Sequence, residues 1–187
     1  MKDFVISLLK NNLPEYYFYH NYKHTLYVVE KAMEIGKHEG CTEADLELLT
    51  TAALWHDTGY IVTYSNHEEE SCALARQYLP GFGYSPDLID TVIGMIMATK
   101  IPQEPKNKLE EILADADLEY LGSDAFSIKA ESLFREYQNI KPAMTEADWN
   151  KAQISFLQKH HYFTRFCKLN REPAKQLHLK ELAQRMQ

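Results

Sequence analysis

The chain has 187 residues, 45% of them apolar and 25% charged, and a formal net charge of −7 at pH 7. This size and composition are typical of one globular domain with a substantial core. The negative charge argues against a general nucleic-acid-binding surface, because such a surface needs clustered lysine and arginine to displace counterions. We therefore expect a single domain over residues 1–187 that has no nucleic-acid polymer as a partner.

No apolar stretch approaches the roughly 18 residues of a membrane-spanning helix, so no membrane partner is expected. The first apolar segment is broken by Lys10 and Pro14 and has no small-residue cleavage site, which makes it a poor signal peptide. Three cysteines, Cys41, Cys72 and Cys167, are widely spaced and odd in number, which favours reduced thiols. These features together favour a cytoplasmic protein.

Helical periodicity dominates the chain, and we find no strand-like alternation with turn residues. The seven glycines and seven prolines mostly separate the periodic segments. The prediction is an all-α fold, a compact helical bundle. In chain order the expected helices cover about 2–12, 21–38, 43–56, 67–80, a segment from 86, 108–122, a segment from 124, 146–169 and a short segment from 173.

Several of these starts carry capping residues. Thr42 and Thr145 each precede a helix and have an aspartate three residues later, and Ser85 precedes a proline at the first helical position. Asn66 and Asn107 are also predicted caps, and glutamates 68–70 would lie in a positively polarised first turn.

The helix predicted over 108–122 contains two aspartates that face different ways. Its apolar residues share one face at about 100° per residue. Asp117 flanks that face, whereas Asp115 points well away from it. Asp117 is therefore the better candidate for an inward-facing ligand, and Asp115 is expected to be solvated or to support a ligand.

The pair His56-Asp57 ends an apolar run, Ala-Ala-Leu-Trp. A histidine and an aspartate at the end of a buried helix are costly to bury without partners, and metal coordination satisfies both. His24 upstream and Asp117 downstream suit the same role. Each residue alone has an ordinary structural explanation, so the argument depends on the ordered set.

This ordered set resembles the HD superfamily of metal-dependent phosphohydrolases. The likeness covers roughly residues 20–122 and includes AALWHDTGY, HEEES and DADLEYLG. It implies that His24, His56, Asp57 and Asp117 hold a divalent ion. Two imidazoles and two carboxylates suit Mn²⁺, Mg²⁺, Fe²⁺, Co²⁺ or Ni²⁺, and zinc is disfavoured because the set has no cysteine. Four ligands on an octahedral ion leave one position for water and one for a phosphate oxygen.

The resemblance also indicates assisting residues after the HD pair. His67 would ligate a second ion or bind a phosphate, and Glu68 would transfer a proton, so we assign catalytic roles to Asp57, His67 and Glu68. The alternative for Glu68 is simple complementation of the helix N-terminus. Residues 95–100 lack the histidines typical of two-metal members, which argues against a full two-metal site.

Candidate substrate-binding residues are His20, Lys23, Lys100 and Arg165. The alternatives are ordinary packing for His20 and solvated charges for the basic residues. We do not assign His160 and His161 to the metal site, because tandem histidines more often lie on a surface.

The resemblance implies a phosphohydrolase for a small phosphate ester or anhydride, with a nucleotide as the leading substrate class. Nucleotide monophosphatase, cyclic-nucleotide or dinucleotide phosphodiesterase and triphosphohydrolase remain open, and an alarmone hydrolase is disfavoured. The alternative of a different class is a catalytically silent nucleotide-binding sensor. Aromatic residues in the C-terminal helices would permit a homodimer.

Overall fold

The computed structural model of the chain describes residues 1–185 and confirms the all-α prediction, because these residues form helices and loops without strands. The α-helices are α1 (Lys2–Asn12), α2 (Tyr22–His38), α3 (Glu43–Trp55), α4 (His67–Tyr78), α5 (Pro86–Ala98), α6 (Lys108–Asp117), α7 (Phe126–Ile140), α8 (Glu146–Lys159), α9 (Arg165–Asn170) and α10 (Glu172–Arg185). Single-turn 3₁₀ helices are η1 (Thr58–Ile61), η2 (Leu79–Phe82) and η3 (Glu119–Gly122). Within the described residues no helix is both long and apolar enough to span a bilayer.

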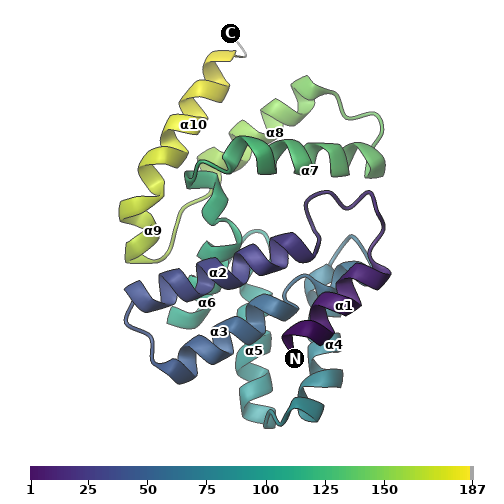
Figure 1. Cartoon of the computed structure of the whole chain (residues 1–187). Coiled ribbons are helices and arrows are strands. Elements are labelled where there is room, and N and C mark those ends of the chain that lie inside the picture. Colours follow the sequence, from purple (N-terminus) through teal and green to yellow (C-terminus); the bar gives the residue numbers. More distant parts are fainter. Residues whose placement is uncertain (186–187) are drawn as a thin grey trace.

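The first six helices form the main core of the molecule, in the lower half of Figure 1. Helix α2 packs against α3 and α6, and α5 packs against both of these. The facing positions are apolar and fully buried, including Val28, Ile35, Leu49, Val92 and Ile112. This packing brings the start of α2, the end of α3 and the end of α6 together.

Most of the predicted helix caps are confirmed. Thr42 with Asp45, and Thr145 with Asp148, form reciprocal capping boxes. Asn66 is an exception, because its side chain makes no cap hydrogen bond and its backbone is left-handed, with φ of 56°. Asparagine tolerates this conformation better than most residues, so Asn66 serves a tight turn before α4.

The prediction of a single helix over 108–122 was wrong for the second half of this range. Helix α6 ends at Asp117, and η3 follows after Leu118. Gly122 then lies against the start of α10, where an added Cβ would lie 2.1 Å from the carbonyl oxygen of Arg171. Close packing against Arg171 therefore constrains the chain that follows α6, and α6 itself ends at the metal-ligand candidate Asp117.

The expectation that Asp115 is solvated was also wrong. Asp115 is fully buried, and its carboxylate accepts hydrogen bonds from Phe163 N at 2.9 Å, Thr164 N at 2.8 Å and the Thr164 hydroxyl at 2.6 Å. The segment 160–164, distant in sequence, covers the face of α6 that a helical wheel assigns to solvent.

The same contact explains why the helix predicted over 146–169 is broken. Helix α8 ends at Lys159, the chain is non-helical over 160–164, and α9 begins at Arg165 with Thr164 as its cap. The predicted short final helix is in fact the 14-residue α10. A second cluster joins these C-terminal helices to the core through Tyr19, Leu118, Tyr120, Leu121, Phe126, Ala130, Leu157 and Leu182. The three cysteines are free, as expected.

Candidate metal centre

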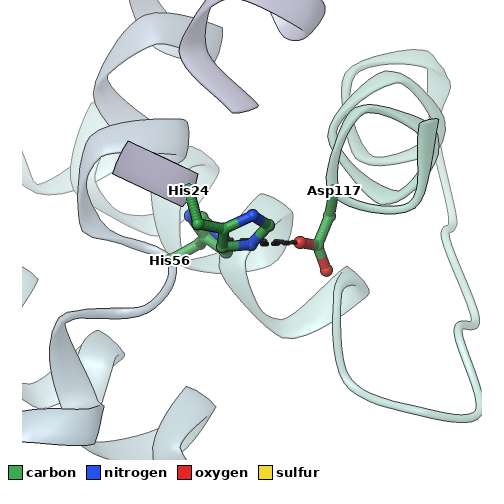
Figure 2. A group of neighbouring side chains, drawn as sticks. All are labelled: His24, His56 and Asp117. Atoms are coloured by element: carbon green, nitrogen blue, oxygen red, sulfur yellow. Dashed lines mark hydrogen bonds and ion pairs between the residues drawn. The ribbon is translucent and has the colours of Figure 1, made fainter. Parts of the chain in front are cut away.

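The four predicted ligands come from three helix ends that the core packing brings together. His24 lies in the first turn of α2, His56 and Asp57 directly follow α3, and Asp117 is the last residue of α6. Figure 2 shows His24 and His56 directed toward the Asp117 carboxylate. One ligand atom from each of these three residues lies within 4.8 Å of the other two.

The separations between ligand atoms match those around a metal ion. His24 Nε2 is 3.0 Å and His56 Nε2 is 3.6 Å from Asp117 Oδ1. Asp57 Oδ2 is 3.4 Å from His24 Nε2 and 3.3 Å from His56 Nε2. Adjacent ligands on an octahedral ion with bonds of about 2.1 Å lie about 3.0 Å apart. A small adjustment would therefore bring these atoms into ligand positions.

Unpartnered polar atoms at the centre provide the test of fit. His56 Nε2 and Asp57 Oδ2 are buried and have no hydrogen-bond partner within the described residues. Leaving buried polar atoms without a hydrogen bond is costly, whereas a cation would satisfy both. His56 Nδ1 is 2.8 Å from the Ala53 carbonyl oxygen and donates to it, which leaves the Nε2 lone pair for a metal. The residues therefore fit a divalent ion.

The electrostatics of the cluster keep both carboxyl groups ionised. Burial opposes charge on Asp57 and Asp117, but the neighbouring His24 and His56 outweigh it, so the pKa of each carboxyl lies below its ordinary value. Burial lowers the pKa of His24, which favours the neutral imidazole that a metal requires. For His56, burial also disfavours charge, but the two aspartates outweigh it and raise the pKa. A cation would compete with the proton on His56.

His67 and Glu68 lie beside this cluster at the start of α4. His67 Nε2 is 3.3 Å from Asp57 Oδ1, and the His67 ring stacks on Tyr60 with centroids 3.8 Å apart. The side chain of Glu68 is almost completely buried, and its Oε2 lies 3.5 Å from His67 Nδ1. Gly59 permits this approach, because a Cβ there would lie 1.9 Å from the His67 carbonyl oxygen.

A further acidic residue, Glu136, was not found by the sequence analysis. It is fully buried on α7 and accepts hydrogen bonds from Tyr19 N at 2.9 Å and His20 N at 3.0 Å, and its second oxygen pairs with His20 Nδ1. Burial disfavours charge on His20, but Glu136 outweighs it and raises the His20 pKa. No local motif marks Glu136, since it lies 116 residues from His20 in the chain.

One cavity of about 720 Å³ contains most of the candidate residues. Its wall includes His20, Asp57, His67, Glu68 and Asp117, and also Lys100. Lys100 forms an ion pair with Glu69 at the rim. Lys23 and Arg165 are exposed and do not line the cavity, so the structure brings neither of them to the metal centre. His160 lies instead beside Lys175, whose Nζ donates to the His160 carbonyl oxygen at 2.6 Å.

Comparisons with known proteins agree with this architecture. The family model of the HD domain matches residues 21–119, which include all four predicted ligands. No curated protein sequence matches the chain significantly. The chain is similar to the crystal structure of a predicted HD superfamily hydrolase from an uncultured Thermotogales bacterium, with a TM-score of 0.65, 22% sequence identity, and coverage of 98% of this chain and 89% of that one. At this identity the structural likeness shows the fold alone, and the family model, which covers more than half of the chain, shows that the protein belongs to the HD-domain family.

Proposed function

We propose that the protein is a metal-dependent phosphohydrolase that acts on a small phosphate ester or anhydride, with nucleotides as the first class to test. The observation that carries the proposal is that two buried atoms, His56 Nε2 and Asp57 Oδ2, have no hydrogen-bond partner within the described residues, and that Asp57 lines a cavity large enough for an organic molecule. HD-domain proteins generally bind divalent metals, which supports the same reading.

His24, His56, Asp57 and Asp117 would hold the ion, with Mn²⁺, Mg²⁺, Fe²⁺, Co²⁺ or Ni²⁺ preferred to Zn²⁺ for this ligand set. Such an ion would supply Lewis-acid activation of water and would offset the charge of the phosphoryl group. Both carboxylates are ionised at neutral pH because their pKa values are lowered. The chain therefore presents a charged, preorganised cluster to the reacting phosphate.

His20 is proposed to deliver a proton to the leaving oxygen. Glu136 fixes its Nδ1 side and favours the protonated ring, while Nε2 makes no hydrogen bond within the described residues and the side chain lines the cavity. His67, whose Nε2 is 3.3 Å from Asp57 Oδ1, and the neighbouring Glu68 are proposed to accept the proton of the attacking water. Lys100 at the rim would attract the anionic substrate. Lys23 and Arg165 have no role in this proposal.

The test combines metal content with phosphate release. Wild-type protein, Asp117→Asn and the matched control Asp124→Asn, whose exposed side chain lies outside the cavity, would be screened with nucleotides and phosphate esters in the presence of each metal. The proposal predicts metal-dependent turnover in wild type and control, and loss of both metal and turnover in Asp117→Asn.

Two results would contradict the proposal. Bound metal with no turnover of any phosphate compound, but with saturable nucleotide binding, would instead support a sensor. Equal metal content in wild type and Asp117→Asn would overturn the assignment of the metal centre itself.

A further inference from the structure

The cavity is much larger than the metal centre requires. Its volume is about 720 Å³, within the range of pockets that enclose whole organic molecules. An inorganic phosphate or a very small ester would occupy only the end beside Asp57 and Asp117. The remaining space continues along α7, the connection over 141–145 and α8, and we call this part the apolar arm.

The two ends of the cavity differ in chemistry. The metal end carries the acidic and imidazole groups, whereas the arm is lined mainly by Leu121, Leu133, Ile140, Met144, Trp149 and Phe156. Lys141 is the one formally charged side chain among the described residues that line the arm, and Gln153 contributes an amide. Few groups are available there to replace the water around a sugar or a second phosphate.

Aromatic packing gives the arm a defined wall. Trp149 of α8 stacks on Phe134 of α7 with centroids 5.6 Å apart and planes at 18°, and it contacts Tyr137 with centroids 5.7 Å apart. The half-buried Trp149 ring therefore bridges the two helices and also lines the cavity. Removal of this apolar surface from water by a ligand lowers the free energy and so favours binding.

Charge also argues against a polyphosphate in this cavity. The metal end already contains Asp57, Glu68 and Asp117, and Lys100 is paired with Glu69. A divalent ion offsets one phosphoryl group, but a chain of phosphates would need further cations. Apart from Lys141, the arm has none among the described residues.

We propose that the apolar arm binds an apolar organic group, aryl or long-chain alkyl, attached to the phosphate that reacts at the metal centre. This inference rests on the proposed phosphohydrolase function and narrows its substrate to apolar phosphate esters. Continuity of the arm with the metal end of one cavity supports this occupant, because phosphate and organic group would then be bound as a single molecule.

The experiment measures kcat/KM for primary alkyl phosphates from ethyl to dodecyl, for 1-naphthyl phosphate and for 5′-nucleoside monophosphates. Burial of one methylene contributes about four-fold in binding, so kcat/KM should rise by up to this factor per carbon until the arm is filled. A preference for naphthyl over alkyl esters, or the reverse, identifies which apolar group the arm takes. A flat chain-length dependence, or preference for nucleotides over both apolar series, would overturn the inference.

Two variants on α8 sharpen the measurement. Ala152 is exposed and lines the cavity, so Ala152→Trp should narrow the arm without disturbing the core. We expect at least a ten-fold loss of kcat/KM for dodecyl phosphate and no change for ethyl phosphate. Ala147→Trp, on an exposed position of α8 that does not line the cavity, is the matched control and should change neither. Equal losses for both esters in Ala152→Trp would contradict a role in substrate selection.

Binding of non-hydrolysable alkyl phosphonates, measured by calorimetry, separates this inference from the proposed function. Affinity that rises with chain length and falls in Ala152→Trp, without turnover of any phosphate ester, would support binding of an apolar group in the arm and refute the hydrolase function. Metal-dependent turnover of phosphate esters, together with phosphonate affinity that does not depend on chain length, would support the hydrolase and refute binding of an apolar group in the arm.

Discussion

The metal-binding end and the C-terminal helices of this protein contribute to one cavity by different means. The metal end uses His24, His56, Asp57 and Asp117 at three helix ends that pack together in the main core. Helices α7 and α8 carry none of these ligands, yet they supply the buried Glu136 and the walls of the apolar arm. Under the proposed function, the motif-bearing part would supply the reaction chemistry, while the part without a motif would position the proton donor and shape the substrate-binding space.

The largest effect is expected from a ligand substitution at the metal end. Asp57→Asn replaces a carboxyl group whose pKa the adjacent imidazoles hold low, and so removes its negative charge. Metal affinity and activity should therefore both fall. We expect activity to decrease by about 10³-fold or more, since activation of water depends on the ion. Metal content by mass spectrometry and phosphate release by a coupled assay check this together. Full metal occupancy with normal turnover in Asp57→Asn would show that Asp57 is not a metal ligand.

A substitution at Asp115, in the contact between the two regions, should mainly affect stability. Asp115→Ala leaves the half-buried N–H group of Phe163 and the buried N–H group of Thr164 without their carboxylate acceptor. The expected loss in free energy of unfolding is about 3 kcal/mol, which for a chain of this size lowers Tm by about 6–12 °C. Thermal and urea unfolding provide the measurement. A Tm within 2 °C of wild type would contradict the anchoring role of Asp115.

A substitution on the C-terminal side should reduce catalysis while sparing the metal. Glu136→Gln removes the carboxylate that favours protonated His20, so the His20 pKa should fall and the alkaline limb of the rate profile should move to lower pH. At pH 8 we expect kcat to decrease by about 10²-fold, with metal content unchanged. His20→Gln should show a similar rate loss and no such limb. An unshifted pH profile in Glu136→Gln would argue for a structural role alone.

The smallest effect concerns the pH dependence of stability. His20 has a raised pKa in the folded protein, so its pairing with Glu136 stabilises the fold fully below the unfolded value of about 6.5 and loses this contribution as pH rises through the folded value. The free energy of unfolding of wild type minus that of His20→Gln should therefore decrease above about pH 6.5. Urea unfolding of both proteins across this range checks the sign, and the subtraction removes groups that titrate equally in both.

Local features of the chain were enough to predict the helical class and most helix starts. The capping boxes at Thr42 and Thr145 depend on residues three positions apart, and the structure contains both. The HD family was also recognisable, because its motif residues keep a fixed order along the chain and the family model matches the same region. Such signals survive in sequence because they depend on short-range geometry or on an ordered set of residue types.

Tertiary packing determines which helices stop early, which polar groups are buried and how the cavity is shaped. Asp115 was expected in solvent because a helical wheel does not include segment 160–164, which covers it and breaks the helix predicted over 146–169. Glu136 gains its role only when α7 packs beside His20. Lys23 and Arg165 do not reach the cavity, whose apolar arm depends on how α7 and α8 are placed. These features come from contacts between residues far apart in sequence, and packing and desolvation, rather than local propensity, determine them.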